Sequence, residues 1–272
     1  MKGKDNLLEE PLILLSSEKI KAALHDPSIQ IDVLESVDST NDYLKKNSSL
    51  HKKIRVCLAE MQTQGKGRMN RVWHSPFGQN IYLSLLYPIQ KDIRELSGLS
   101  LVVGLAVSRA IENIVGLDNQ ILLKWPNDIV INGLKMAGIL IEIQAKAKKL
   151  SHLVIGIGVN VNMQAPEKAH IDQAWTSLKK HTDQYQDRNQ LSAEMINQVI
   201  AYLNKFLGTG LSYFMDEWKQ KDSWSGRTIK LLSSGVIYSG VSVGINIQGQ
   251  YLLMQSDKRI RAFSSENTTA LK

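Results

Sequence analysis

The feature of this sequence that most constrains its fold is a series of short apolar runs bounded by turn residues. Asn132-Gly133 is a strong two-residue hairpin signal, because both residues tolerate the positive φ angles that such a turn requires. It separates two of the runs and therefore predicts an antiparallel pair. The runs that we interpret as strands of one mixed or antiparallel sheet are Ile54–Glu60, Asn80–Tyr87, Ile121–Lys124, Ile129–Ile131, Met136–Ile143 and Leu153–Val161.

Helical patterns are interspersed with these strands. Leu96–Val115 has apolar residues at helical spacing and ends at Gly116. A helix is also predicted to open at Asp38-Ser39-Thr40, whose side-chain oxygens can cap a first turn. Further helices are predicted over Glu18–Leu24, Leu191–Leu207 and Tyr213–Trp218. The combination predicts an α+β protein.

After Gly226 the pattern changes to short β runs separated by glycines, which predicts a small C-terminal barrel. These runs are Thr228–Leu232, Val236–Val243, Gly249–Met254 and Arg259–Phe263. A chain of 272 residues is long enough for one large domain and a smaller companion. We expect an N-terminal extension over 1–29, a main domain over 30–222 and a C-terminal domain over 223–272.

Composition excludes several classes of protein. The single cysteine, Cys57, permits no internal disulfide and no cysteine-rich zinc site, as is typical of a reducing compartment. Apolar runs such as Leu99–Ala106 are shorter than a membrane span, and the first residues do not resemble a secretory signal. We therefore expect a cytoplasmic protein without a membrane span. The net charge of +7 is spread along the chain and does not by itself identify a partner.

Lys135 is the first candidate for chemistry. Strict alternation places it on the same strand face as Ala137, Ile139 and Ile141, so a cation heads an apolar face. Such a lysine either extends to solvent at the edge of the sheet or points into a pocket that holds an anion.

The segment Gly65–Arg71 reads as a functional loop. Its glycines let backbone amides approach a ligand, and Lys66, Arg68 and Arg71 add positive charge suited to phosphate or carboxylate. An ordinary surface loop has the same composition, and the spacing fits neither a P-loop nor a dinucleotide fingerprint.

Two further motifs are rich in polar residues that could bind a ligand. In Lys124-Trp125-Pro126-Asn127-Asp128, the last two residues either cap a turn or hold a ligand, with Asp128 able to attract Mg²⁺ or an amine. Gly156–Asn162 reads as a strand with close backbone approach or as a pocket wall. The histidines form no zinc or catalytic-triad motif, and we interpret His74 as structural.

Taken in order, these motifs resemble the biotin protein ligases, whose catalytic domain has the fold of lipoate ligases and class II synthetases. The matching segments are Asp38–Asn41, Glu60–Arg68, Trp73 with Ser75–Gly78, Asn80–Ser84, Lys124–Asp128, Lys135–Glu142 and Gly156–Asn162. The resemblance implies a mixed sheet with helices followed by an SH3-like barrel. It also implies that the chain joins biotin to ATP as biotinyl-5'-AMP and then transfers biotin to a lysine of a biotin carboxyl carrier protein.

The resemblance assigns residues to three roles. The residues implied to contact biotin are Ser39, Thr40, Asn41, Gln62, Gly65, Lys66, Gly67, Arg68, Lys135 and Gly138. Those implied to contact ATP or the adenylate are Arg68, Arg71, Trp73, Asn127, Lys135 and Asn160. Those implied to be catalytic are Arg68, Lys135 and Asp128, with Mg²⁺ entering with ATP near Asp128 rather than at a fixed protein site.

Two departures from the family pattern are evident. Met69-Asn70 stands where many bacterial relatives have Arg-Gly, which bears on how the loop orders. The extension over 1–29 is too short for the winged helix of bifunctional relatives, so we expect a monofunctional enzyme, or a remnant of a repressor-type ancestor, that does not bind DNA. A homodimer is compatible with the sequence.

Three alternatives stay open at this stage: a lipoate or octanoate ligase of the same fold, a biotin-responsive regulator without its DNA-binding domain, and an inactive biotin-binding paralogue.

Overall fold

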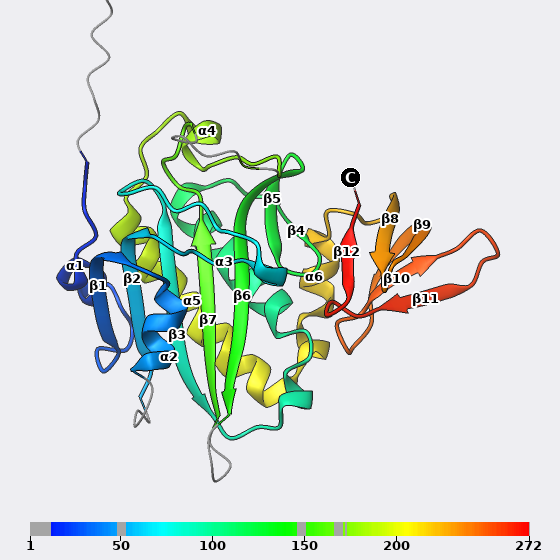
Figure 1. Ribbon diagram of the computed structural model, residues 1–272, viewed down its shortest axis with the longest axis horizontal. Coiled ribbons are helices and arrows are strands. Elements are labelled where there is room, and N and C mark those ends of the chain that lie inside the picture. Colours follow the sequence, from blue (N-terminus) through cyan, green and yellow to red (C-terminus); the bar gives the residue numbers. More distant parts are fainter. Residues whose placement is uncertain (1–11, 48–52, 146–150, 166–170, 172, 272) are drawn as a thin grey trace, which may run out of the picture.

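A seven-stranded mixed sheet forms the centre of the structure, a computed structural model that describes residues 12–47, 53–145, 151–165, 171 and 173–271 (Figure 1). The strand order is β1-β2-β3-β7-β6-β5-β4, in which β1 and β2 are parallel and all other neighbours are antiparallel. The strands are β1 (Gln30–Val37), β2 (Arg55–Gln62), β3 (Ile81–Ile89), β4 (Ile121–Lys124), β5 (Asp128–Ile131), β6 (Leu134–Ala145) and β7 (Ser151–Val159).

Helices pack on both faces of this sheet. The two long helices α3 (Leu99–Val115) and α5 (Arg188–Thr209) pack against each other behind the sheet in Figure 1, and α1 (Ser17–Ala22) packs on α5. On the opposite face, α2 (Thr40–Lys46) packs on β2, β3 and β7. The remaining helical segments are α4 (Lys179–Thr182), α6 (Met215–Lys221), and the 3-10 turns η1 (Arg68–Asn70), η2 (Ile93–Leu96) and η3 (Leu211–Phe214).

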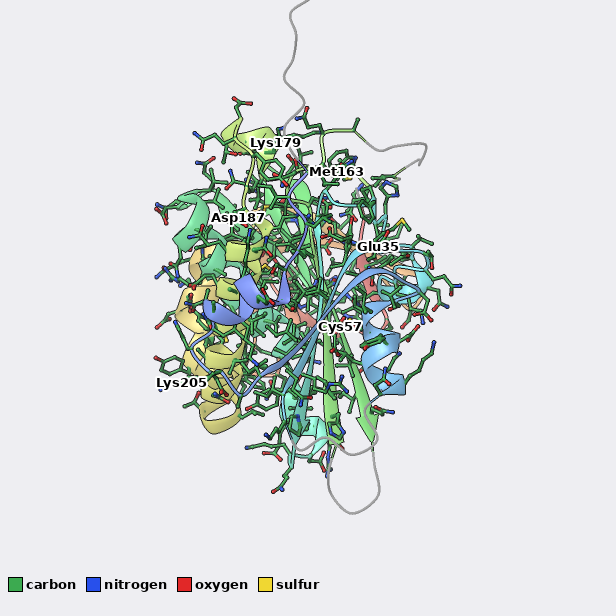
Figure 2. All side chains as sticks on the ribbon, turned by 90° about the vertical axis from the view of Figure 1, so that its left-hand side faces the viewer. Glu35, Cys57, Met163, Lys179, Asp187 and Lys205 are labelled. Carbon is green, nitrogen blue, oxygen red and sulfur yellow. The ribbon has the colours of Figure 1, made fainter. Side chains whose placement is uncertain are left out.

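Alternation along β2 separates two hydrophobic cores. Val56 and Leu58 belong to the main core, which includes the buried face of α3, whereas Cys57 belongs to a smaller core with Leu44 of α2. Cys57 is fully buried near the middle of the molecule (Figure 2), and this burial raises the pKa of its thiol. The cysteine is therefore structural, since the thiolate form that reacts is disfavoured.

One described segment, Arg94–Val115, is long and apolar enough to cross a membrane by length and composition. Most of it is buried inside the protein. The predicted helix over Leu96–Val115 in fact begins at Leu99, because Gly98 adopts a left-handed conformation with φ of 81° that separates α3 from η2.

The C-terminal part of the chain forms a second, five-stranded antiparallel sheet in the order β11-β10-β9-β8-β12 (Figure 1). Its strands are β8 (Thr228–Ser233), β9 (Val236–Ile245), β10 (Tyr251–Met254), β11 (Ile260–Phe263) and β12 (Thr268–Ala270). Tyr251 joins it to the main domain. The Tyr251 ring lies 5.4 Å from that of Trp125, and its hydroxyl donates to the buried Asp222 carboxylate.

The α+β class, the sheet of mixed direction and the C-terminal β module agree with the sequence prediction. Two strands, β1 and β12, were not predicted. β1 is a half-buried edge strand that carries Asp32 and Glu35, which weakens its apolar pattern. In the segment predicted as an extension, Leu15 and Ile20 are buried in the main core. Residues 1–11 lie outside the described residues.

Candidate active site

A cavity of about 780 Å³ opens on the face of the sheet that carries α2. It is lined from α2, β2, β6, β7, the segment before α4, the Trp125–Asp128 turn and β12 of the C-terminal sheet. The predicted site residues that line it are Ser39, Thr40, Asn41, Gln62, Lys66, Gly67, Arg68, Arg71, Trp73, Asn127, Asp128, Lys135, Gly138 and Asn160. Residues that are separate in sequence thus meet at one site.

Gly65 is the predicted site residue that does not line the cavity. Its carbonyl accepts a hydrogen bond from the Trp73 amide at 2.9 Å. A Cβ at this position would lie 2.5 Å from the Trp73 carbonyl oxygen and 2.8 Å from Ser75 Oγ. The glycine therefore allows the two ends of the loop to approach each other. It does not serve to bring the backbone close to a ligand.

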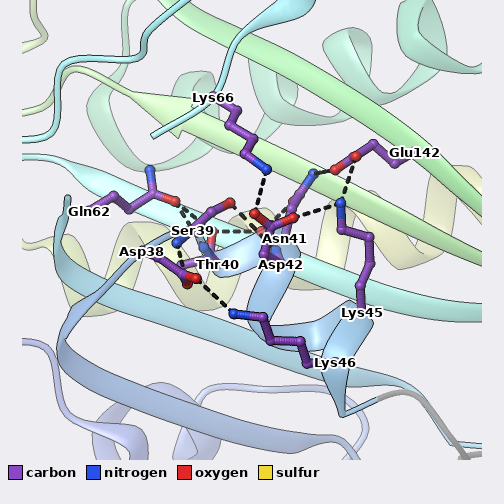
Figure 3. Close-up of polar contacts among 11 residues, drawn as sticks. Asp38, Ser39, Thr40, Asn41, Asp42, Lys45, Lys46, Gln62, Lys66 and Glu142 are labelled. Carbon is purple, nitrogen blue, oxygen red and sulfur yellow. Dashed lines mark hydrogen bonds and ion pairs between the residues drawn. The ribbon is translucent and has the colours of Figure 1, made fainter. Parts of the chain in front are cut away.

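One end of the cavity carries uncharged hydrogen-bonding groups (Figure 3). The Thr40 amide and hydroxyl both donate to Gln62 Oε1, at 2.9 and 3.1 Å. The hydroxyls of Ser84 and Thr40 are 2.7 Å apart, and Ser84 Oγ lies 2.6 Å from Asn41 Oδ1. Ser39 caps α2, because its hydroxyl accepts from the Asp42 amide. Ser39, Thr40, Asn41 and Gln62 line the cavity, and the buried Ser84 supports them from behind the lining. We name these five residues the amide end of the cavity.

The Asn41 side chain packs directly against the backbone of Gly156. A Cβ on Gly156 would lie 2.5 Å from Asn41 Oδ1, so a side chain there would displace the asparagine. Asn41 Nδ2 donates to Glu142 Oε2 at 2.7 Å. The side chain is fixed through both its oxygen and its nitrogen, which makes this wall of the cavity rigid.

The glycine-rich loop, Gly65–Trp73, crosses the cavity as a narrow hairpin. The Gly67 amide donates to the Arg71 carbonyl at 2.6 Å, and Lys66 and Val72 form an isolated bridge. At its tip, Met69 and Asn70 have φ angles of 53° and 59°. Both residues therefore occupy the left-handed region, where the conformational free energy of a glycine is lower than that of other residues.

Trp73 docks the end of this loop onto two glycines. Gly138 of β6 and Gly158 of β7 are cross-strand partners. A Cβ on Gly158 would lie 2.4 Å from the Trp73 ring, and one on Gly138 would lie 3.1 Å from it. The Lys135 ammonium lies 5.3 Å from the ring centroid. The paired glycines form a slot without side chains that accepts the indole.

Lys135 does point into the cavity, but not for the reason that strict alternation gave. A β-bulge between β5 and β6 pairs Val130 with Lys135 and Ile129 with Ala137, which leaves Met136 as the extra residue. Ala137 and Met136 are both in the main core. The Lys135 side chain instead lies beside Gly138, whose added Cβ would be 3.3 Å from Nζ. The predicted shared face of Lys135 and Ala137 is therefore wrong, because the bulge redirects the lysine.

Arg68 and Asp128 complete a charged end of the cavity with Lys135. Lys135 Nζ lies 2.7 Å from Asp128 Oδ1, and Gln173 Nε2 donates to Asp128 Oδ2 at 3.3 Å. Burial lowers the pKa of the Arg68 guanidinium, an effect that the nearby Asp128 charge opposes, and arginine stays charged at neutral pH. We name Arg68, Asp128 and Lys135 the charged end of the cavity.

Arg68 also connects the loop to distant parts of the chain. It donates to Asn127 Oδ1 at 3.3 Å and to the Ser265 carbonyl in the turn between β11 and β12. Asn127 Nδ2 donates to the Ile139 carbonyl, and Asn160 Nδ2 to the Thr176 carbonyl. The two asparagines therefore hold backbone segments around the cavity.

Several lining residues were not predicted as ligand contacts. Trp175 lines the cavity from the segment before α4, and its neighbour Thr176 donates its amide to the Lys135 carbonyl. His74, predicted to be structural, lines it too. A lone tryptophan in a polar stretch was the available signal for Trp175. No local signal marks Thr268–Ala270, which line the cavity only because the two sheets pack together.

The described residues contain no group of three or more His, Cys, Asp and Glu side chains that could hold a metal ion. Asp128 is the carboxylate at the charged end, and its two oxygens already contact Lys135 and Gln173. This donor set suits a divalent ion held mainly by a ligand's phosphates and water, not a resident metal.

Comparison with known proteins decides the family. Residues 33–160 match the model of the biotin/lipoate A/B protein ligase family. The bifunctional ligase/repressor BirA of Escherichia coli is 36% identical over 253 residues, which cover 93% of this chain and 77% of BirA. This chain belongs to the biotin/lipoate A/B protein ligase family.

Other family members extend the likeness. The biotin--[acetyl-CoA-carboxylase] ligase of Mycobacterium tuberculosis is 29% identical over 82% of this chain and 83% of its own length. The structure of the Aquifex aeolicus biotin protein ligase in complex with biotin and ATP superposes with a TM-score of 0.76 at 30% identity. It covers 89% of this chain and 99% of the Aquifex chain, so the family likeness includes the C-terminal sheet.

Proposed function

We propose that this protein is a biotin protein ligase, which converts biotin and ATP to biotinyl-5'-AMP and pyrophosphate and then transfers biotin to a carrier lysine. The observation that carries the proposal is that the amide end and the charged end line one and the same cavity. Biotin's ureido ring offers N–H donors and a carbonyl acceptor, which the groups of Thr40, Gln62 and Asn41 complement. The linear chain of lipoate or octanoate has no ureido group to complement them.

The charged end fits the first half-reaction. The biotin carboxylate attacks the α-phosphorus of ATP, and these two anionic groups repel until nearby cations neutralise them. Lys135 and Arg68 supply that charge from the strand and the loop. One preorganised contact of this kind contributes about 2.7–4 kcal/mol to the transition state. Mg²⁺ would enter with the triphosphate near Asp128.

The loop and Asp128 fit the second half-reaction. The adenylate is a mixed anhydride, so a loop that covers it protects it from water. The carrier lysine amine attacks the acyl carbon, the bond to phosphate breaks and AMP leaves. Asp128 would orient this amine and accept its proton once the phosphate has drawn Lys135 away. Trp175 offers a flat face on which the purine can stack.

The partner that we propose is the biotin carboxyl carrier protein of acetyl-CoA carboxylase. The buried, single cysteine supports a cytoplasmic location, which cell fractionation tests. We also propose a homodimer, and sedimentation velocity with and without biotin plus ATP measures the oligomeric state.

The experiment is incubation of the protein with ATP, Mg²⁺, biotin and a carboxylase carrier domain, followed by a streptavidin blot. We expect a biotinylated carrier that depends on ATP and is lost when the carrier lysine is replaced by alanine. Excess lipoate should compete weakly. Modification of the carrier by lipoate but not by biotin would replace the proposal with the lipoate ligase alternative.

A further inference from the structure

A chain of alternating charges connects the glycine-rich loop to the amide end of the cavity (Figure 3). Lys66 Nζ lies 2.5 Å from Asp42 Oδ2, and Lys45 Nζ lies 2.7 Å from Asp42 Oδ1. Lys45 Nζ is also 2.7 Å from Glu142 Oε1, whose other oxygen accepts from Asn41 Nδ2. Each carboxylate uses one oxygen for each of its two neighbours.

Asp42 occupies the central position in this chain. It stands in the first turn of α2 directly after Asn41, and its side chain is 19% exposed compared with 45% for Lys66. The less exposed partner is thus fixed on a helix, and the more exposed one belongs to the loop. Lys66 lines the cavity, and its ammonium contacts Asp42.

We propose that Asp42 is a positioning residue, which holds the glycine-rich loop over the adenylate by binding Lys66 and thereby slows loss of the intermediate between the two half-reactions. This inference rests on the proposed ligase function. It assigns to Asp42 a role in retention of the intermediate and none in bond formation, because its carboxylate contacts lysines and not the charged end.

The ion pair between Asp42 and Lys66 is strengthened because Asp42 also binds Lys45. An isolated exposed ion pair contributes little, whereas a carboxylate that receives two charge-assisted hydrogen bonds is more strongly held. Burial acts to raise the pKa of Asp42, but hydrogen bonds from Lys45 and Lys66 outweigh it and the pKa lies below the usual aspartate value. The carboxylate stays ionised at neutral pH. The loop's other charged anchor, Arg68, instead donates to Asn127 Oδ1.

The test measures release of preformed, radiolabelled biotinyl-AMP into a chase of unlabelled biotin and ATP, in parallel with its rate of formation. We expect Asp42→Asn to release the adenylate about three- to tenfold faster, with a smaller change in formation. Asp42→Glu should recover most of the retention. Raising the salt concentration should speed release from the wild-type protein more than from Asp42→Asn, because screening weakens only an existing ion pair.

A double-mutant cycle identifies the partner. If Asp42 acts through Lys66, the variant Asp42→Asn/Lys66→Met should release the adenylate no faster than Lys66→Met alone. The matched control is Asp257→Asn, which removes an exposed ion pair to Arg259 in the turn between β10 and β11 and should leave release unchanged.

Wild-type release rates in Asp42→Asn, or additive effects in the double variant, would overturn the inference while leaving the ligase proposal intact. Absence of adenylate formation in the wild-type protein would instead overturn the proposed function.

Discussion

The two ends of the cavity differ in the chemistry of their side chains and in the elements that carry them. At the amide end, Thr40, Asn41 and Gln62 are tied to one another or to Ser84 by hydrogen bonds and sit on regular elements of the fold. At the charged end, Lys135 comes from a bulged strand and Arg68 from a loop with left-handed residues at its tip. The first end is held by hydrogen bonds and is largely uncharged, whereas the second depends in part on a loop.

This contrast implies a division of labour. Fixed dipoles discriminate between ligands, because an analogue without matching donors and acceptors forms fewer hydrogen bonds with them. Cations stabilise charge that develops in the transition state, and they gain strength when the loop excludes water. Substitutions at the amide end should therefore change the affinity for biotin, and substitutions at the charged end should change the rate of adenylate formation.

The largest effect should come from the charged end. Lys135→Ala should slow adenylate formation by roughly a hundredfold or more, because a preorganised cation is lost at the reacting phosphate. Single-turnover quenched flow with biotin and ATP in excess over enzyme measures this rate. The matched control is Lys205→Ala, which removes an ammonium stacked on Tyr213, and neither residue lines the cavity. Normal formation by Lys135→Ala would remove this lysine from the catalytic residues.

The next effect concerns the amide end. Thr40→Val removes a hydroxyl that contacts Gln62 and Ser84, so the equilibrium affinity for biotin should fall by about tenfold to a hundredfold. Calorimetric titration with biotin alone measures it, and thermal unfolding shows whether the variant is folded. Thr209→Val, at the end of α5, is the control. Unchanged affinity in a folded Thr40→Val protein would argue against a biotin contact at this end.

A smaller effect is expected where the loop docks. Gly158→Ala places a methyl group within 2.4 Å of the Trp73 ring, so the indole must move and adenylate release should accelerate about five- to twentyfold. Gly208→Ala, a helical site with nothing within 4 Å, is the matched control. If the slot acts through the indole, Gly158→Ala should have no further effect on release in a protein that already carries Trp73→Ala. A persistent effect in that background would show that the glycine serves another purpose.

The smallest effect concerns the segment that carries Trp175. His181 Nε2 lies 2.8 Å from Thr176 Oγ1, and burial together with the Lys180 charge lowers the pKa of His181 below 6.5. Below about pH 6.5 the unfolded chain therefore takes up a proton that the folded chain resists, and stability present above that pH declines as the pH falls. Between pH 7.5 and 5.5, the melting temperature should fall on the order of 1 °C more in the wild-type protein than in His181→Gln. Equal slopes would contradict this assignment.

Sequence patterns predicted those parts of the molecule that depend on local chemistry. The Asn132-Gly133 turn is present with φ angles of 51° and 77°, and Ser39 caps α2 as expected. The resemblance to a family made it possible to predict that the motif residues meet at one cavity. Their individual roles stay predictions until they are measured.

Other features depend on tertiary context and could not be predicted. The bulge that redirects Lys135 arises from pairing between β5 and β6, which alternation along one strand does not reveal. The contact of Arg68 with Ser265 joins residues that are far apart in the chain. The Asp42–Lys66 pair likewise needs the loop to cross α2.

The most direct test of the account is biotin-dependent exchange of labelled pyrophosphate into ATP, measured over a range of biotin concentrations for the wild-type, Lys135→Ala and Thr40→Val proteins. We predict that Lys135→Ala lowers the maximal exchange rate with little change in the biotin concentration at half-maximal rate. Thr40→Val should raise the biotin concentration at half-maximal rate with little change in the maximal exchange rate. If both substitutions change the same constant, the two ends of the cavity do not divide recognition from catalysis and the account is contradicted.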